Sequence, residues 1–316
     1  MTLNDCFNET VKESFNNTKV SYWFKKTFPD ISYVLICKLI RKGVIRINGS
    51  RIKISHILKE NDQIKIPKAL RCEKAEKVEV NLSNHSKRRA LELVIYKDNE
   101  FIVLNKPSGL SVQGGTNVKI NVDLLLDALR FDYDERPKLV HRIDKDTSGV
   151  LLIARTLESA KFATELFRNK KISKIYIAIV FGKLKENLGM IDFPLDEKDK
   201  LLDSKTYYKV IHVKSKYSIV ALNPITGRKH QLRKQLYKLG NPIVGDDKYY
   251  VNNNITNNFL LKNKLNLHAF YLSFYRSDKK KLEFKILPNI KMIENFTKLG
   301  FDISNFNINS FLDFKQ

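Results

Sequence analysis

The sequence of 316 residues contains only three cysteines and no long apolar run. Cys6, Cys37 and Cys72 are odd in number and lack metal-ligand spacing, so we expect reduced thiols, with neither a disulfide framework nor a structural metal. No apolar stretch approaches the roughly 20 residues of a membrane-spanning helix. The N-terminal residues include acidic side chains and lack the apolar core of a secretory signal. These absences predict a soluble, cytoplasmic protein without a membrane partner.

Acidic residues are also scarce relative to basic ones. The chain has 34 Asp and Glu against 57 Lys and Arg, a formal net charge of +23. Such an excess indicates an anionic partner, either nucleic acid or a membrane surface. No basic amphipathic helix of the membrane-surface type stands out, so nucleic acid is the favoured partner.

The positive charge is concentrated near the N-terminus. Residues 20–71 contain twelve Lys or Arg against three acidic residues, a balance of +9. The apolar side chains of residues 31–40 follow a helical period, with Ser32 as the expected N-cap and Gly43 as the expected end. A charge run alone is usually only a solvated face, so this pattern leaves open a basic helical hairpin without a specific partner.

The dipeptide Asn48-Gly49 follows this helix and predicts a tight hairpin turn, because both residues tolerate positive φ. Another strand is expected to begin at Ile64. In this order of helices, turn and short strands, residues 20–67 resemble the S4 RNA-binding domain. The resemblance implies RNA contacts from the basic side chains of Lys38, Arg41, Lys42, Arg46, Arg51 and Lys53.

The rest of the chain alternates neighbouring strands with occasional helices. We expect a hairpin with its turn at residues 97–100, helices at 157–167 and 228–239, and strand-like runs at 174–181, 207–213, 217–222, 267–274 and 281–286. This pattern favours an α+β domain with a largely antiparallel mixed sheet. The expected divisions are an N-terminal extension (1–19), an S4-like RNA-binding domain (20–70), a polar linker (71–90), a catalytic domain (91–300) and a C-terminal tail (301–316).

The segment His141-Arg142-Ile143-Asp144-Lys145-Asp146-Thr147-Ser148-Gly149 carries the strongest functional pattern. It is a polar loop that leads into an apolar strand at residues 150–154. A carboxylate in such a loop can be oriented by its neighbours rather than moving freely in solvent. Asp144 and Asp146 are therefore the candidate catalytic carboxylates, and an Asx-type turn is the simpler interpretation for Asp146.

This segment resembles the signature of the RluA-type pseudouridine synthases, a His-Arg-Leu-Asp run followed two residues later by Thr-Ser-Gly. The resemblance implies that Asp144 is catalytic, that Asp146 occupies a variable position, and that Arg142 fills the space vacated by a flipped-out nucleotide. The order of domains and the Gly114-Gly115 pair are most similar to the large-subunit ribosomal type C of this family.

Three further segments support the resemblance. Asn105-Lys106-Pro107-Ser108-Gly109-Leu110 resembles the entry to the catalytic domain and is interpreted as mainly architectural. Lys174-Ile175-Tyr176 resembles the strand whose tyrosine lies against the target base. Residues 226–233, TGRKHQLR, imply that Arg233 pairs with Asp144, while Lys234-Gln235 replaces the family's Val-His.

The implied reaction isomerises uridine to pseudouridine in large-subunit (23S) ribosomal RNA, without a cofactor or metal and with the protein expected to be a monomer. A carboxylate near the sugar C1′ can stabilise an oxocarbenium-like centre, attack it, or remove a proton, and the residues do not choose among these roles. Two alternatives remain at this point: a synthase that acts on transfer RNA, and an inactive RNA-binding assembly factor.

Overall fold

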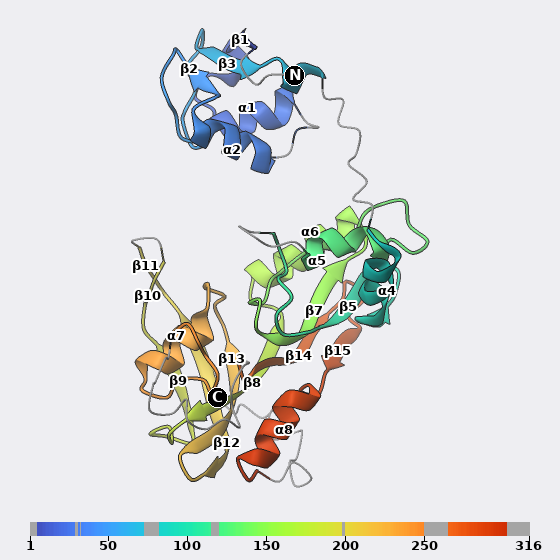
Figure 1. Ribbon diagram of the computed structural model, residues 1–316, viewed down its shortest axis with the longest axis vertical. Helices are drawn as coiled ribbons and strands as arrows, with labels where there is room; N and C mark the ends of the chain where they lie inside the picture. The colour runs from blue at the N-terminus through green and yellow to red at the C-terminus, as the bar shows by residue number, and fades with distance from the viewer. Residues whose placement is uncertain are drawn as a thin grey trace. The chain divides into compact units, whose positions relative to one another are not determined.

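The computed structural model describes residues 5–28, 31, 33–72, 82–114, 120–197, 200–249 and 265–301. The chain divides into two compact units, Met1–Asn81 and Leu82–Gln316 (Figure 1). Within the described ranges, no helix is both long and apolar enough to cross a membrane. Cys6 and Cys37 are free thiols.

The N-terminal unit packs two helices against a small antiparallel sheet. Its elements are β1 (Cys6–Thr10), η1 (Glu13–Phe15), α1 (Val20–Thr27), α2 (Tyr33–Lys42), β2 (Arg46–Ile47), β3 (Gln63–Pro67) and α3 (Ala69–Cys72). The strand order is β1-β3-β2, and the core holds Trp23, Phe24 and Ile36. The prediction of a separate extension over residues 1–19 was wrong, because β1 pairs with β3 from Cys6↔Pro67 to Thr10↔Gln63.

The turn signals of this unit are confirmed. Gly43 adopts a φ of 72° directly after α2, a conformation that L side chains rarely adopt. Asn48 and Gly49 both have positive φ, 48° and 76°, and the turn is closed by the bridge between Ile47 and Ser50. The expected N-cap Ser32 lies outside the described residues.

The second unit is built on a ten-stranded sheet. Its strands are β4 (Val94–Lys97), β5 (Phe101–Lys106), β6 (Lys138–Leu139), β7 (Ser148–Ala154), β8 (Ser173–Phe181), β9 (Leu188–Asp192), β12 (Lys205–Lys214), β13 (Tyr217–Pro224), β14 (Leu267–Tyr275) and β15 (Lys281–Lys285). The main order is β4-β5-β7-β14-β8-β13-β12-β9, with β15 on β14 and β6 on β7. The pair β7–β14 is parallel and the other pairs are antiparallel, so the predicted α+β class with a largely antiparallel mixed sheet is confirmed.

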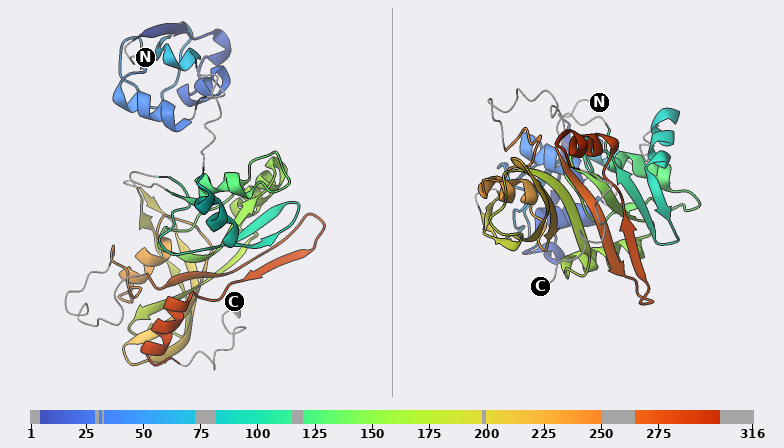
Figure 2. Two further views of the ribbon diagram at one scale, coloured as in Figure 1. Left: turned by 45° about the vertical axis from the view of Figure 1, so that its right-hand side comes forward. Right: turned by 90° about the horizontal axis from the view of Figure 1, so that it is seen from below.

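Helices cover both faces of this sheet (Figure 2). They are α4 (Asn84–Glu92), α5 (Val122–Leu125), η2 (Leu126–Leu129), α6 (Leu157–Arg168), α7 (Gln231–Lys238) and α8 (Ile290–Lys298), and a short hairpin joins β10 (Leu195–Asp196) to β11 (Leu201–Leu202). Because strand side chains alternate, α7 packs on Ala178 and Val220, whereas α8 packs on Ile177 and Ile219 of the opposite face.

The predicted linker at residues 71–90 needs correction. Residues 84–92 form α4, in which the Ser83 side chain caps the Ser86 amide and Ala90 is buried against the sheet. The helix is otherwise almost entirely polar, so its sequence has no apolar period that predicts a helix. Residues 73–81 lie outside the described residues.

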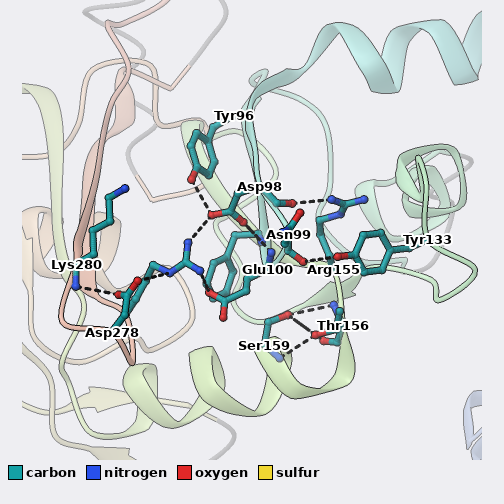
Figure 3. Close-up of polar contacts among 12 residues, drawn as sticks. Tyr96, Asp98, Asn99, Glu100, Tyr133, Arg155, Thr156, Ser159, Asp278 and Lys280 are labelled. Atoms are coloured by element: carbon teal, nitrogen blue, oxygen red, sulfur yellow. Dashed lines mark hydrogen bonds and ion pairs between the residues drawn. The ribbon is translucent and has the colours of Figure 1, made fainter.

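A dense polar cluster lies at the end of β7 that leads to α6 (Figure 3). The Arg155 side chain is 1% exposed; its guanidinium donates to the Asp98 carbonyl at 2.6 Å and to the Asp132 carboxylate at 2.5 Å, and stacks 4.0 Å from the centre of the Tyr133 ring. Arg276, after β14, pairs with the Asp98 carboxylate at 2.9 Å. Both guanidinium groups thus bind protein oxygens and tie three strand ends together, although the buried Nε of Arg155 has no hydrogen-bond partner among the described residues.

Candidate active site

Asp144 lies at the other end of β7, in the loop that precedes the strand. Its carbonyl accepts from the Thr147 amide at 3.2 Å, which closes a turn. The loop lines a pocket of about 580 Å³ between β8 and the β13–α7 connection. Asp144, Tyr176 and Arg142, all predicted site residues, line this same pocket.

The Asp144 loop is held in place from both sides. Before it, the His141 ring stacks on Phe167 with ring centres 4.6 Å apart, and its Nε2 accepts from the Leu152 amide at 2.8 Å. Burial lowers the pKa of His141 to about 3, so the ring is neutral and serves as an acceptor. After it, the Lys145 carbonyl accepts from the Gly109 amide at 2.9 Å.

Lys106 is a second support for the loop. Its side chain is fully buried at the end of β5, and its ammonium donates to the carbonyls of Pro107, Leu110 and Lys145 at 2.8–3.0 Å. Burial lowers the pKa of Lys106 to about 7, against the raising effect of Asp146 and Asp144. The architectural interpretation of residues 105–110 therefore has a specific form: this segment anchors the backbone beside Asp144.

The loop ends at Gly149, a position that only glycine can occupy without strain. Its φ is 109°, and a Cβ at this position would lie 2.1 Å from the Ala269 carbonyl oxygen. The close approach occurs where β7 and β14 pair in parallel, at Gly149↔Ala269. Any side chain would push these strands apart directly behind the Asp144 loop.

The Asp144 carboxylate lies in a strongly heterogeneous electrostatic environment. Its side chain is 19% exposed, and burial raises the pKa of its carboxyl while the charges of Arg233, Arg142 and Lys106 oppose that rise. Among the described residues, the only ionisable nitrogen within 4.0 Å of this carboxylate is His230 Nε2, at 3.9 Å. Burial also lowers the pKa of His230 to about 4, so this ring is neutral at pH 7 and gives Asp144 no formal countercharge.

Tyr176 reaches the pocket from β8. Burial, reinforced by the negative charge of Asp144, raises the pKa of its phenol. The phenol is therefore protonated at neutral pH and can donate a hydrogen bond or offer its ring for stacking. Arg142 differs in that it is exposed at the pocket.

The predicted pair between Arg233 and Asp144 is corrected by the structure. Arg233 is 3% exposed and forms a two-point pair with Asp246, with Nε 2.8 Å and Nη2 2.6 Å from the two carboxylate oxygens. No hydrogen bond or ion pair joins Arg233 to Asp144 among the described residues. The positive charge of Arg233 opposes the rise in the pKa of Asp144 without a direct bond, and Asp246, to which the sequence assigned no role, is the direct partner of Arg233.

Gln235, which stands where the family has a histidine, belongs to a buried amide network. Its side chain accepts from Thr206 Oγ1 at 2.6 Å and donates to the Ser204 carbonyl and hydroxyl. Gln231 also donates to Thr206 and accepts from the Arg228 amide. The two glutamines fasten α7 and the preceding loop to β12, so Gln235 has a structural role away from the pocket.

The basic side chains predicted to contact RNA lie on the N-terminal unit. Lys38, Arg41, Lys42, Arg51 and Lys53 are exposed. Arg46 is half-buried and donates to the carbonyls of Gly43 and Gly49, so part of its capacity supports the turn. In the part of the chain that the structure describes, no group of three or more His, Cys, Asp or Glu could hold a metal ion.

Known proteins resemble this chain over most of its length. The family model for RNA pseudouridylate synthase matches residues 100–238. Ribosomal large subunit pseudouridine synthase C of Buchnera aphidicola is 35% identical over 292 residues, which cover 86% of this chain and 90% of the relative. This chain belongs to the RNA pseudouridine synthase family. The enzyme of the same name from Vibrio parahaemolyticus is 32% identical to this synthase over 76% of this chain and 78% of its own.

A solved structure agrees with the fold of this synthase. Human RNA Pseudouridylate Synthase Domain Containing 4 superimposes with a TM-score of 0.58 at 26% identity, over 68% of this chain and 97% of the human one. The predicted family and the pseudouridine synthase fold are thus confirmed.

Three residues in or near the synthase's pocket were missed or undervalued from sequence alone: Lys174 lines it, while His230 and Lys106 lie beside Asp144 or its loop. His230 precedes α7 with a φ of 54° and bonds the Tyr249 hydroxyl through Nδ1 at 2.9 Å. Lys106 was predicted only to belong to a mainly architectural segment. Lys174 stood in a quoted motif without a role, although its place two residues before Tyr176 on a strand predicts that both side chains share a face.

Proposed function

We propose that this synthase isomerises uridines of large-subunit ribosomal RNA and that Asp144 is its catalytic carboxylate. The observation that carries the proposal is the place of Asp144: a largely buried carboxylate in a pocket, on a loop anchored by Lys106 and by backbone groups, and without a direct cationic partner among the described residues. Two relatives named for the large ribosomal subunit support the choice of RNA.

The chemistry explains why such a carboxylate is needed. Pseudouridine forms when the bond between uracil N1 and ribose C1′ breaks, the base turns, and C5 bonds to C1′. A carboxylate that is not engaged by an ion pair is free to approach an electron-poor C1′ or a proton beside it. Arg233 contributes a favourable positive field while its hydrogen-bonding groups stay with Asp246.

The neighbouring residues suit an extruded nucleotide. Reaching C1′ and C5 in a stacked RNA requires the nucleotide to leave the stack, which costs a few kcal/mol. In the proposal, Arg142 fills the vacated space, since it is exposed at the pocket. Tyr176 stacks on the uracil, and its neutral phenol takes part in the late proton transfer from C5.

The N-terminal unit is proposed to act as an S4-like RNA-binding domain. Its exposed cations at residues 38, 41 and 42 lie on α2, and those at residues 51 and 53 lie on the segment after the Asn48-Gly49 turn. Exposed lysine and arginine bind phosphates without a large desolvation cost. The unit then supplies affinity and placement, while the second unit supplies the chemistry.

The decisive experiment maps pseudouridines in total RNA from cells with and without the gene for this synthase. The proposal expects sites in large-subunit ribosomal RNA to disappear on deletion and to return with the wild-type gene, but not with Asp144→Asn. Loss of sites only in transfer RNA would overturn the choice of RNA. An unchanged map, together with defective ribosome assembly rescued by Asp144→Asn, would identify an inactive assembly factor.

A further inference from the structure

Lys174 is a charged residue of the pocket that no part of the mechanism above uses. It lies on β8 opposite Leu272 of β14, two residues before Tyr176. Strand side chains alternate, so Lys174 and Tyr176 lie on the same face, and both line the pocket with Asp144.

Lys174 lacks a protein anion. Within the described ranges, no hydrogen bond or ion pair involves its ammonium, which lies 5.9 Å from the centre of the Phe167 ring. The side chain is half-buried, and burial lowers the pKa of its ammonium. A cation that has lost part of its hydration without gaining a partner is costly to keep.

Two other basic residues in this part of the pocket differ from Lys174, because one is neutral and the other has a hydrogen-bond partner. His141 beside Lys174 is neutral, and the Lys174 charge contributes to keeping it so. Arg228 across the pocket donates to the Asp203 carbonyl at 3.0 Å. Lys174 thus places an unpaired positive charge near the reacting groups. A neutral uracil carbonyl would not neutralise this charge, but a phosphate would.

We propose that Lys174 binds a backbone phosphate adjoining the target uridine and so fixes the extruded nucleotide over Asp144. This inference rests on the proposed function, because it takes RNA to be the occupant of the pocket. Its ammonium, which lies 5.9 Å from the centre of the Phe167 ring, acts as a point charge on the phosphate. The pocket volume of about 580 Å³ lies within the usual range for sites that enclose a small ligand.

The test uses the full-length synthase and a ribosomal RNA fragment that contains one uridine it modifies. Lys174→Met keeps the stem and removes the charge, and Lys174→Arg restores a charge. We expect Lys174→Met to weaken RNA binding about tenfold or more and Lys174→Arg to recover most of that loss. The salt dependence of log affinity should fall by about 0.7, the share of one phosphate contact in single-stranded RNA.

A neutral methylphosphonate placed in turn 5′ or 3′ of the uridine then identifies the contact. On one of the two modified RNAs, wild type and Lys174→Met should bind equally, because the partner charge is already gone. Lys171→Met, which removes an exposed charge outside the pocket, should keep the same ratio to wild type on all three RNAs. Melting curves of the Met and Arg variants verify that both are folded.

A Lys174→Met defect of the same size on all three RNAs, or no defect at all, overturns the proposal. Neither outcome touches the proposed function, which is judged by turnover of the wild-type enzyme on the natural fragment. Failure of the wild type to modify any ribosomal RNA would instead reject the proposed function.

Discussion

The charged side chains at the two ends of β7 differ in whether they have protein partners. At the Arg155 end, the Arg155 guanidinium has a carboxylate and a carbonyl as partners, and Arg276 pairs with two carboxylates. At the Asp144 end, Asp144 and Lys174 share a pocket without a direct ion pair to any strong acid or base among the described residues. The charges at the first end bind protein groups, whereas we propose that those at the second end are available for a ligand.

The largest effect should come from the carboxylate itself. Asp144→Asn keeps the size of the side chain but removes its charge and nearly all of its nucleophilicity, so conversion should be abolished while RNA still binds. The measurement is tritium release from C5-labelled uridine in ribosomal RNA. Asp146→Asn is the matched control and should retain most activity. Activity that survives in the Asp144 variant, or is lost only in the Asp146 variant, means that the carboxylates are assigned in the wrong order.

Tyr176→Phe should have the next largest effect on the reaction. The change keeps the ring but removes the phenolic oxygen, whose pKa is raised by burial and by Asp144. If that oxygen handles the late proton transfer, single-turnover rates should fall by roughly 100-fold at unchanged RNA affinity. An unchanged rate would limit Tyr176 to stacking.

At the opposite end of β7, Arg155→Met should damage the fold and not the chemistry. The buried guanidinium is replaced by a side chain that leaves the Asp98 carbonyl without its donor. We expect a loss of about 2–3 kcal/mol in unfolding free energy, seen as a lower melting temperature, with normal turnover at low temperature. Arg88→Met removes an exposed i,i+4 pair and should change the free energy by less than about 0.5 kcal/mol.

The N-terminal cations should have the smallest effect per residue. Arg41→Gln with Lys42→Gln removes two exposed charges at the end of α2. We expect weaker RNA binding at low salt, a salt slope reduced by up to about 1.8 if both contact duplex phosphates, and an unchanged rate once RNA is saturating. A reduced saturated rate would show that this unit does more than bind.

Local patterns predicted most of the fold. Strands such as β8 and β13 are long, apolar and bounded by polar turns, and the predicted runs at 174–181 and 217–222 lie within the observed elements. The missed elements lack such patterns. The polar helix α4 buries Ala90 alone among its residues, and β1 is defined by pairing with a strand more than fifty residues away.

In the site, too, some residues could be predicted from local sequence patterns and others could not. Asp144, Arg142 and Tyr176 could be found because they belong to a recognisable signature and its companion strand. The sequence could not show that Arg233 pairs with Asp246 rather than with Asp144, because the pairing depends on which carboxylate the fold brings within 3 Å of the guanidinium. That Lys174 has no ion-pair partner among the described residues is likewise a result of three-dimensional packing, which the sequence alone does not show.

The contrast between the two ends of β7 is tested most directly by the melting temperature of Asp144→Asn. Because burial raises the pKa of Asp144, the ionised carboxylate lowers the stability of the folded state at neutral pH, and a neutral amide removes that cost. The account predicts a melting temperature equal to or above that of the wild type, in a protein that no longer makes pseudouridine. A decrease as large as that of Arg155→Met would show that Asp144 supports the fold in the same way as the paired charges do, and would contradict the account.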